Sequence, residues 1–490
     1  MGLDWHAAAY RAVLTDAVEL AVRHHETIAH APTTTARGRE EIAALFDEPL
    51  PQEPQPASTI LREVEERIFA NSTLYGSPRF FGYINGSGTQ VGAVAELLAA
   101  VVNQIPAKYH FAPAATEVER RVVRWLAEFI GYGPDAHGCL LGGGSAGNLA
   151  GLAMARQRHA GFDAAATGMR AGPPLTAYVS REGHASLDKA MALLGMGREQ
   201  LRRIAVRDDF TMDLDALARE VDADRRRGAR PICVVANAGT TNTGAIDPLD
   251  ALADFCREQG LWLHVDAAYG GPAAATRTAG PLFHGLARAD SAVLNPHKWL
   301  YVPVEAACIL VRDPDALRDT FHVTADYLRE PESASDGQLD FKDYGPQLTR
   351  SFRALKVWMT FKAYGARALR DAIEGNLAVM RHLAARIDAS EDFVRLAPVP
   401  LSTVCFQYRP ASPGRDATEE WVDALNARLP AALERDGRVF LSATRIAGRP
   451  ALRACTVNHR VREEDADALL DVIRDVARAL LQRPETPTVP

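Results

Sequence analysis

Short apolar runs alternate with amphipathic helical patterns through the middle of the chain, and this alternation predicts the main fold. Runs with the length of buried strands lie at 139–141, 175–179, 204–206, 232–236, 261–265, 292–294 and 306–311. Between them, apolar residues recur at helical spacing over 145–158, 185–194, 213–228 and 248–259. Strands and helices in this order predict an α/β fold with a mostly parallel sheet covered by helices.

The flanking segments have other patterns. Residues 1–85 show helical spacing interrupted by several prolines, which predicts an N-terminal helical arm packed elsewhere, such as on a partner subunit. Residues 86–370 are predicted to form the large domain, 371–483 a small C-terminal α+β domain, and 484–490 a disordered, Pro-rich tail. Further elements are predicted as helices at 352–386, 417–433 and 463–482 and as strands at 403–408, 438–442 and 452–457.

Composition excludes several classes of protein. The 490 residues carry a formal net charge of −7 without a basic stripe, which argues against a nucleic-acid-binding protein. No uncharged apolar run reaches the roughly 18 residues that a membrane span needs. The six cysteines show no CxxC spacing and the start of the chain does not resemble a secretory signal. Reduced thiols in a cytoplasmic protein are therefore expected.

Lys298 directly follows one of the apolar runs, and no other lysine of the chain has such a position. An ammonium held against apolar surface is costly, so such a site lowers the lysine pKa. The neutral amine is then free to form an imine with a carbonyl cofactor. The alternative interpretation is a lysine whose stem covers apolar surface while its ammonium reaches water.

Glycine and polar residues follow other strands, at the edge where parallel sheets bind ligands. Residues 142–148 (Gly-Gly-Gly-Ser-Ala-Gly-Asn) open a helix whose first N–H groups, with the Ser145 hydroxyl, suit a phosphate. The alternative is a tight turn that binds no ligand. A dinucleotide site is disfavoured, because it would need an acidic residue at the end of a strand about 20 positions later and the sequence has no strand there. His184 follows the next strand and either stacks on a planar ring or makes structural hydrogen bonds.

Asp266 ends the run at 261–265, and a carboxylate in that position needs a partner. The partner is either a protonated pyridine nitrogen or a metal shared with His264, and no further His or Cys cluster supports the metal. The small residues at 237–244 allow a ligand to approach closely or form a plain turn. One ligand, pyridoxal 5′-phosphate, would use all four features in this order: the phosphate loop, the histidine, the aspartate and the lysine.

The same motifs resemble one enzyme family. The run Asn-Pro-His-Lys-Trp at 295–299, with His-Val-Asp-Ala-Ala-Tyr at 264–269, is similar to the group II pyridoxal-phosphate decarboxylases, the aromatic-L-amino-acid decarboxylase family. Residues 183–186, 239–241 and 350–358 match the family as well. The resemblance extends from about Pro78 to Trp358.

The resemblance implies pyridoxal-phosphate-dependent fold type I and an obligate homodimer with active sites at the subunit interface. It implies an imine at Lys298, Asp266 at the pyridine nitrogen and His184 stacked on the ring. The other expected cofactor contacts are Gly144, Ser145, Thr241, Ala268, Asn295 and His297. Tyr344 matches the family's catalytic loop tyrosine, and Tyr327 is the second candidate because the loop is shorter here.

The resemblance implies decarboxylation of an L-amino acid to the amine and carbon dioxide. The expected substrate wall consists of Tyr83, Ile84, Asn85, Ile105 and Ala107. Aromatic-acid members have a phenylalanine near the position of Ala107, so this wall is less aromatic. Aromatic substrates are favoured, while acidic or aliphatic ones stay open.

Other activities also stay open. One is oxygen-dependent decarboxylation with deamination to an aldehyde. Another is a different fold type I reaction such as transamination, for which Arg453 would bind the substrate carboxylate. The last is a structural protein without a cofactor, which would lack the absorbance of an imine.

Overall fold

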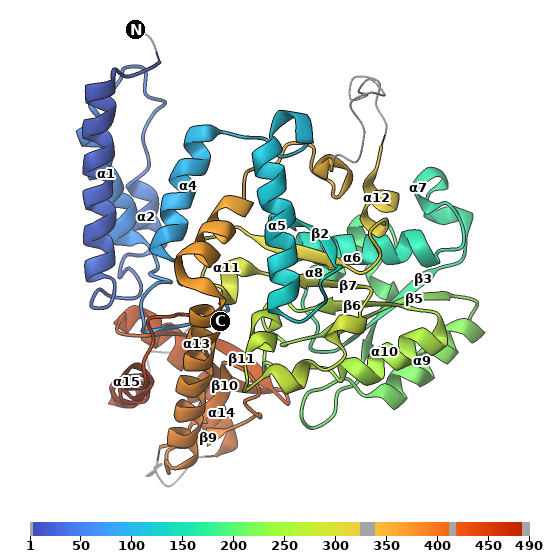
Figure 1. Ribbon diagram of the computed structural model, residues 1–490. Helices are drawn as coiled ribbons and strands as arrows, with labels where there is room; N and C mark the ends of the chain where they lie inside the picture. Colours follow the sequence, from blue (N-terminus) through green and yellow to red (C-terminus); the bar gives the residue numbers. More distant parts are fainter. Residues whose placement is uncertain (1–2, 324–338, 411–417, 483–490) are drawn as a thin grey trace.

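The computed structural model describes residues 3–323, 339–410 and 418–482, which contain two β-sheets with helices packed around them (Figure 1). The larger sheet has the strand order β2-β8-β7-β6-β5-β3-β4. Its strands are β2 (His137–Leu141), β3 (Leu175–Ser180), β4 (Leu201–Ile204), β5 (Arg230–Asn237), β6 (Trp262–Asp266), β7 (Ser291–Leu294) and β8 (Ala307–Val311). Tyr327 and the tail predicted at 484–490 lie outside the described residues.

The larger sheet is mostly parallel, which confirms the predicted α/β fold. Each neighbouring pair from β4 to β7 is parallel, and β8 runs antiparallel to both β7 and β2. Residues 232–237 of β5 are buried without a break, as expected for a parallel strand that helices cover on both faces. The carboxyl ends of β2, β3, β5, β6 and β7 therefore lie along one edge of the sheet.

Helices cover both faces of this sheet (Figure 1). One apolar core includes residues of α5 (Pro113–Phe129), α9 (Leu214–Arg226) and α10 (Leu249–Gln259). The other includes residues of α6 (Gly144–His159), α8 (Ser186–Leu193) and α12 (Ala316–Phe321). Consecutive residues of β5 divide between them, because Val234 joins the first core and Val235 the second.

Glycines allow α6 to lie close against β6 and β7. A Cβ on Gly147 would lie 2.2 Å from Cγ2 of Val293, and a Cβ on Gly151 would lie 2.4 Å from Nδ1 of His264. Any larger residue would push the helix away from the sheet, since protein interiors are close-packed. These glycines thus set the start of α6 at the carboxyl edge of the strands.

The smaller sheet has the order β1-β11-β12-β10-β9. It consists of β1 (Phe80–Phe81), β9 (Phe393–Arg395), β10 (Thr403–Tyr408), β11 (Phe440–Ile446) and β12 (Arg449–Cys455), and α14 (Glu419–Asp436) and α15 (Glu463–Gln482) pack with it. Strand β1 lies within the segment predicted to be helical and pairs in parallel with β11. Phe80 stacks on Phe440 with ring centroids 4.9 Å apart, a contact that no local pattern reveals. The domain boundaries stay predictions.

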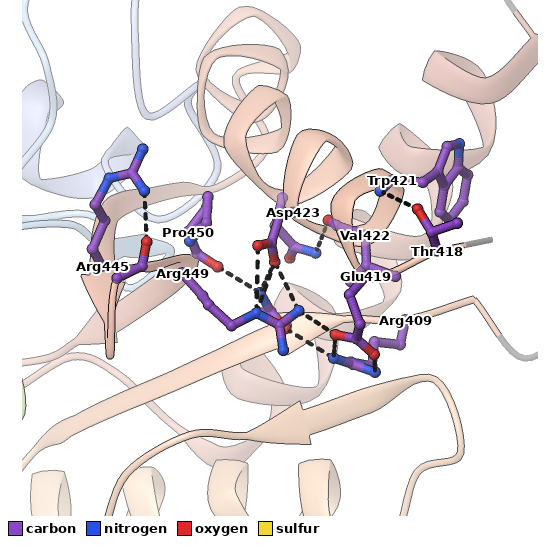
Figure 2. A network of polar contacts seen from close by, with 12 residues as sticks. Arg409, Thr418, Glu419, Trp421, Val422, Asp423, Arg445, Arg449 and Pro450 are labelled. Carbon is purple, nitrogen blue, oxygen red and sulfur yellow. Dashed lines mark hydrogen bonds and ion pairs between the residues drawn. The ribbon is translucent and has the colours of Figure 1, made fainter.

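A polar network ties the start of α14 to this sheet (Figure 2). Arg409, just after β10, donates to Glu419 at 2.6 Å, and Arg449 of β12 donates to Asp423 at 2.8 Å. Arg449 also pairs with Glu419. Exposed ion pairs of this kind contribute little to stability, so the buried apolar residues of α14 hold the helix on the sheet.

The remaining helices are α1 (Ala7–Thr27), α2 (Arg39–Ala44), α3 (Ala57–Glu63), α4 (Gln90–Val102), α7 (Ala164–Thr167), α11 (Pro296–Trp299) and α13 (Ala354–Asp388).

Helix α13 kinks at Gly365, whose φ of 74° suits glycine, so the long helix predicted there is interrupted. The strand predicted at 204–206 is displaced: β4 ends at Ile204, and Val206 pairs with Met212 in an isolated bridge. No helix among the described residues is long and apolar enough to cross a membrane.

Candidate functional site

A cavity of about 340 Å³ lies where β2, β3, β5, β6 and β7 end. Its lining residues are Gly142, Gly143, Gly144, Ser145, Asn148, His184, Ser186, Asn237, Gly239, Thr240, Thr241, Asp266, Ala268, Tyr269, Asn295, His297, Lys298, Val304 and Glu305. The structure thus brings together the predicted residues Gly144, Ser145, His184, Thr241, Asp266, Ala268, Asn295, His297 and Lys298.

The start of α6 forms one wall of the cavity. A Cβ on Gly144 would lie 3.0 Å from Nδ2 of Asn295 and 3.2 Å from Cβ of Ala268, so a larger residue would crowd this wall. The side chain of Ser145 is exposed at the same place. The first N–H groups of a helix have no acceptor within the helix, and the helix dipole favours negative charge there. This wall suits a phosphate group.

Lys298 lies in α11, the single turn that follows β7. Trp299 is fully buried behind it and stacks on Tyr269 with ring centroids 5.2 Å apart. Burial lowers the pKa of Lys298; the negative charge of Asp266 opposes this effect and the positive charge of Arg453 adds to it. More of the amine is therefore neutral than on an exposed lysine, and the neutral amine is the nucleophile.

Asp266 ends β6 and lines the cavity. Its Oδ2 accepts a hydrogen bond from Nδ2 of Asn148 at 2.8 Å, and its Oδ1 accepts one from the N–H of Ala268 at 3.1 Å. Both ring nitrogens of His264 have other partners: Nε2 lies 3.0 Å from Oδ1 of Asn148 and Nδ1 lies 2.8 Å from Oγ of Ser291. Among the residues that the structure describes, no group of three His, Cys, Asp or Glu could hold a metal ion.

His184 follows β3, and Ser186 fixes its ring. Nδ1 of His184 accepts the N–H of Ser186 at 3.1 Å and lies 2.9 Å from the Ser186 hydroxyl. Burial lowers the pKa of His184, and Asp266 partly opposes this effect. A neutral ring with an accepting Nδ1 carries its proton on Nε2.

Asn295 and His297 stand beside the wall formed by α6. Nδ1 of His297 accepts the N–H of Ala306 at 3.0 Å, and burial lowers the pKa of His297 to about 4. Its proton therefore lies on Nε2, which is 3.4 Å from the side-chain amide of Asn295. Oδ1 of Asn295 is buried without a partner among the described residues. If the amide turns over, Oδ1 accepts from His297 and an N–H is left for an anion.

Some predicted site residues do not line this cavity. They are Tyr83, Ile84, Asn85, Ile105, Ala107 and Tyr344. Tyr344 packs edge-on against Phe341 with ring centroids 6.0 Å apart. The side chains of Tyr83 and Ile105 are 57% and 44% exposed, which leaves both free to meet a second copy of the chain. The assignment of these residues to the site stays a prediction.

Other lining residues were not predicted as site residues. The polar ones among them are Asn148, Ser186, Asn237, Thr240, Tyr269 and Glu305. The sequence could have indicated Asn148 as a site residue, because it stands three positions after Ser145 in a predicted helix and so lies on the same face. No local pattern indicates Glu305, because it lies in a loop. In the structure Arg353 donates to Glu305 at 2.6 Å.

These residues fit pyridoxal 5′-phosphate. The wall at α6 and the unpartnered amide of Asn295 suit its phosphate. Asp266 and Lys298 face the same cavity, as a pyridine nitrogen and an aldehyde on one ring require. The cavity volume also lies within the range of small-molecule sites, about 300–1,000 Å³.

Comparison with known proteins gives a consistent result. Residues 40–409 match the model of the pyridoxal-dependent decarboxylase conserved domain. The chain is 31% identical over 461 residues to an aromatic-L-amino-acid decarboxylase of Bacillus atrophaeus, with 94% of each chain covered. It is 32% identical to an acidic amino acid decarboxylase of Homo sapiens, with 89% of this chain and 84% of that protein covered.

Similarity extends to solved structures. The crystal structure of Oryza sativa TDC with PLP and tryptamine matches this chain with a TM-score of 0.92 at 26% identity. The match covers 98% of this chain and 100% of the other.

Proposed function

Because this chain belongs to the pyridoxal-dependent decarboxylase family, we propose that the residues of the cavity perform its reaction in the roles predicted from the sequence. The chain is an amino-acid decarboxylase, a carboxy-lyase, with pyridoxal 5′-phosphate as cofactor. The proposal rests on one observation: Lys298, Asp266 and the start of α6 face the same cavity. Gly144, Ser145, Asn295 and His297 hold the phosphate, with Thr241 and Ala268 beside the ring.

Each polar residue has a separate task in this proposal. Pyridoxal phosphate, when bound, supplies a ring that takes up the electron pair left behind by carbon dioxide. Asp266 would favour a proton on the ring nitrogen by its negative charge. Lys298 would hold the cofactor through its amine, which is the nucleophile of the cavity. His184 would lie against the ring and keep water from that face.

Tyr344 is proposed to protonate the Cα of the product, acting from the second copy of the chain. This assignment favours the amine as product, with an aldehyde as the alternative. Tyr327, outside the described residues, is the second candidate for the role.

The first prediction concerns substrate and product. Purified protein with added pyridoxal phosphate is expected to release carbon dioxide and amine in equal amounts from an aromatic L-amino acid. The measurement offers aromatic, acidic, basic and aliphatic L-amino acids in air and quantifies carbon dioxide, amine, aldehyde and peroxide. Aldehyde with peroxide would count against the role of Tyr344, and no carbon dioxide from any acid would contradict the proposal.

A buried arginine favours a second candidate, an acidic substrate. Arg453 is 3% exposed and donates to backbone carbonyls of Asn242 and Tyr83. Its Nη2 has no partner among the described residues. Buried cations are normally paired, and a carboxylate is the usual partner of a guanidinium. Arg453 does not line the cavity, but its charge acts on Lys298, and in this second candidate the side-chain carboxylate of an acidic substrate supplies the missing partner.

Arg453→Met separates the two substrate classes. If the substrate is acidic, kcat/KM for the acid is expected to fall about 100-fold or more relative to aromatic acids, because a buried charge pair is lost. Arg445→Met on the neighbouring strand β11 is the matched control, since Arg445 donates to the carbonyl of Gly448 at the surface. An unchanged ratio of acid to aromatic activity would exclude Arg453 from substrate recognition.

We also propose that the protein is a homodimer. Helix α4 exposes an unusual number of apolar side chains: Val94, Leu97, Leu98, Val101 and Val102 are each more than 40% exposed. A contiguous apolar surface of this kind is rare on monomers. Ile105 follows this helix and belongs to the predicted substrate wall.

Charges on this helix are expected to separate the subunits. In Leu98→Glu/Val101→Glu, two carboxylates would have to be buried at the interface, so the dimer Kd should rise at least about 100-fold. Light scattering measures the mass, and activity should fall with the dimer. Leu282→Glu, with a similar exposed fraction of 45%, is the control. A variant with the mass of the parent protein would remove α4 from the interface.

A cytoplasmic location is proposed on the state of the cysteines. All six are free and buried in the structure. Free thiols are typical of proteins that stay in a reducing compartment.

A further inference from the structure

A chain of buried hydrogen bonds runs from behind the cavity to Asn148, which lines it. Nε1 of Trp262 donates to Oγ of Ser291 at 2.9 Å, and that hydroxyl lies 2.8 Å from Nδ1 of His264. Nε2 of His264 lies 3.0 Å from Oδ1 of Asn148. None of these four side chains is more than 4% exposed.

The other end of the chain divides at Asn148. Its Nδ2 donates to Oδ2 of Asp266 at 2.8 Å and to Oγ of Ser186 at 2.9 Å. The Ser186 hydroxyl then lies 2.9 Å from Nδ1 of His184. Asn148 therefore contacts both polar groups that the proposed function places against the cofactor ring, one directly and one through Ser186.

The groups at its two ends determine which partner donates in each hydrogen bond of this series. The indole N–H of Trp262 can only donate and the carboxylate of Asp266 can only accept. The Ser291 hydroxyl, which accepts from Trp262, is left to donate to Nδ1 of His264. Nε2 of His264 then carries the ring proton and donates to Oδ1 of Asn148. Nδ2 of Asn148 is thereby turned toward Asp266 and Ser186, and the Ser186 hydroxyl donates to His184.

We propose that Asn148 is a positioning residue that sets the orientation of Asp266 and, through the Ser186 hydroxyl, supports the ring of His184, and that Ser291 and His264 determine which way its amide faces. The inference rests on the proposed function, because it assigns the two oriented groups to the cofactor. It adds residues, His264 and Ser291, that do not line the cavity.

The mechanism makes a specific claim about Ser291. Without its hydroxyl, His264 can move its proton to Nδ1, and Nε2 then becomes an acceptor. The amide of Asn148 would turn its N–H groups toward His264 and its oxygen toward the Asp266 carboxylate. Two acceptors would face each other, and Asp266 would lose its orientation.

Three variants of the holoenzyme test the inference: Asn148→Ala, Ser291→Ala and the double variant. Asn148→Ala is expected to lower kcat about 10- to 100-fold, the usual cost of removing a partner that orients a functional group, with KM changed less than about threefold. Ser291→Ala is expected to lower kcat in the same direction by a smaller factor. The double variant should lose no more than Asn148→Ala, because both changes act through one residue.

A second readout does not depend on turnover. The visible circular dichroism of the bound pyridoxal phosphate reports how its ring is held, and it should change in both single variants. Thr360→Val is the matched control, since it removes a buried hydroxyl that bonds to the carbonyl of Lys356 in α13. It should keep the dichroism and kcat of the parent protein.

The possible results separate the two proposals. The inference is overturned if Ser291→Ala behaves like Thr360→Val, if the two losses multiply in the double variant, or if Asn148→Ala lowers only the melting temperature. A parent protein that binds no pyridoxal phosphate would instead remove the cofactor site itself.

Discussion

Lys298→Ala is expected to lower turnover by roughly four orders of magnitude or more, the scale on which enzymes lose activity when a covalent nucleophile is removed. The burial that lowers the pKa of Lys298 gives its amine the neutral form needed to bind an aldehyde. Alanine has no amine, so the variant should also lose the visible absorbance of the imine and the cofactor that borohydride would otherwise trap on the chain.

The same shift predicts a pH dependence. The rate at which the cofactor-free protein binds pyridoxal phosphate should rise with pH as Lys298 loses its proton. It should level off below the pH at which an ordinary lysine deprotonates, because the pKa of Lys298 is lowered from 10.5. Stopped-flow absorbance measures this rate.

Lys362→Ala is the control for Lys298, because Lys362 lies in α13 with its ammonium 5.7 Å from the ring of Trp358. It should keep both absorbance and activity. Full turnover in Lys298→Ala would end the assignment of the cavity as the active site.

Asp266→Asn is expected to lower kcat about 100- to 10,000-fold, the range attributed to a positioned proton-transfer group. The variant keeps the shape of the side chain and loses its negative charge, so nothing in the cavity would hold a proton on the ring nitrogen. The amide would also present an N–H to either Asn148 or Ala268, both of which donate to Asp266 in the parent protein. Weaker cofactor binding should accompany the loss of rate.

Titration with pyridoxal phosphate, followed by absorbance, separates these two effects. Asp254→Asn, at the surface of α10 where Asp254 pairs with Arg288, is the control. If Asp266→Asn retained the kcat of the parent protein once saturated with cofactor, the carboxylate would serve only to bind and not to hold a proton.

Local patterns in the sequence determined the main sheet, most of its helices and the core of the site. An apolar run between helical patterns can be recognised because β3, β6, β7 and β8 are buried on both faces, whereas the edge strand β4 is not. The carboxyl ends of parallel strands meet at one edge, so Asp266 and Lys298, each placed after its own strand, had to converge. The glycine run before Ser145 was readable for the same reason.

Other features depend on contacts between distant segments, and only the tertiary structure decided them. Asn148 meets His264 across 116 positions in the sequence, and nothing near either residue specifies the other. Strand β1 is two residues long and forms because Phe80 packs on Phe440. The kink of α13 at Gly365 and the displacement of β4 toward Leu201 likewise follow from packing and pairing that override local periodicity.

The contrast has one physical cause. The spacing of apolar residues along a segment reflects which side of that segment packs against the core. It therefore indicates which residues are buried and where a strand ends. Which polar side chains then face each other behind the cavity depends on how closely the elements pack, as when Gly147 and Gly151 bring α6 onto β6 and β7. The sequence by itself indicated most of the residues that we propose to meet the cofactor, and the packing of α6 on the sheet decided which residues contact them from behind.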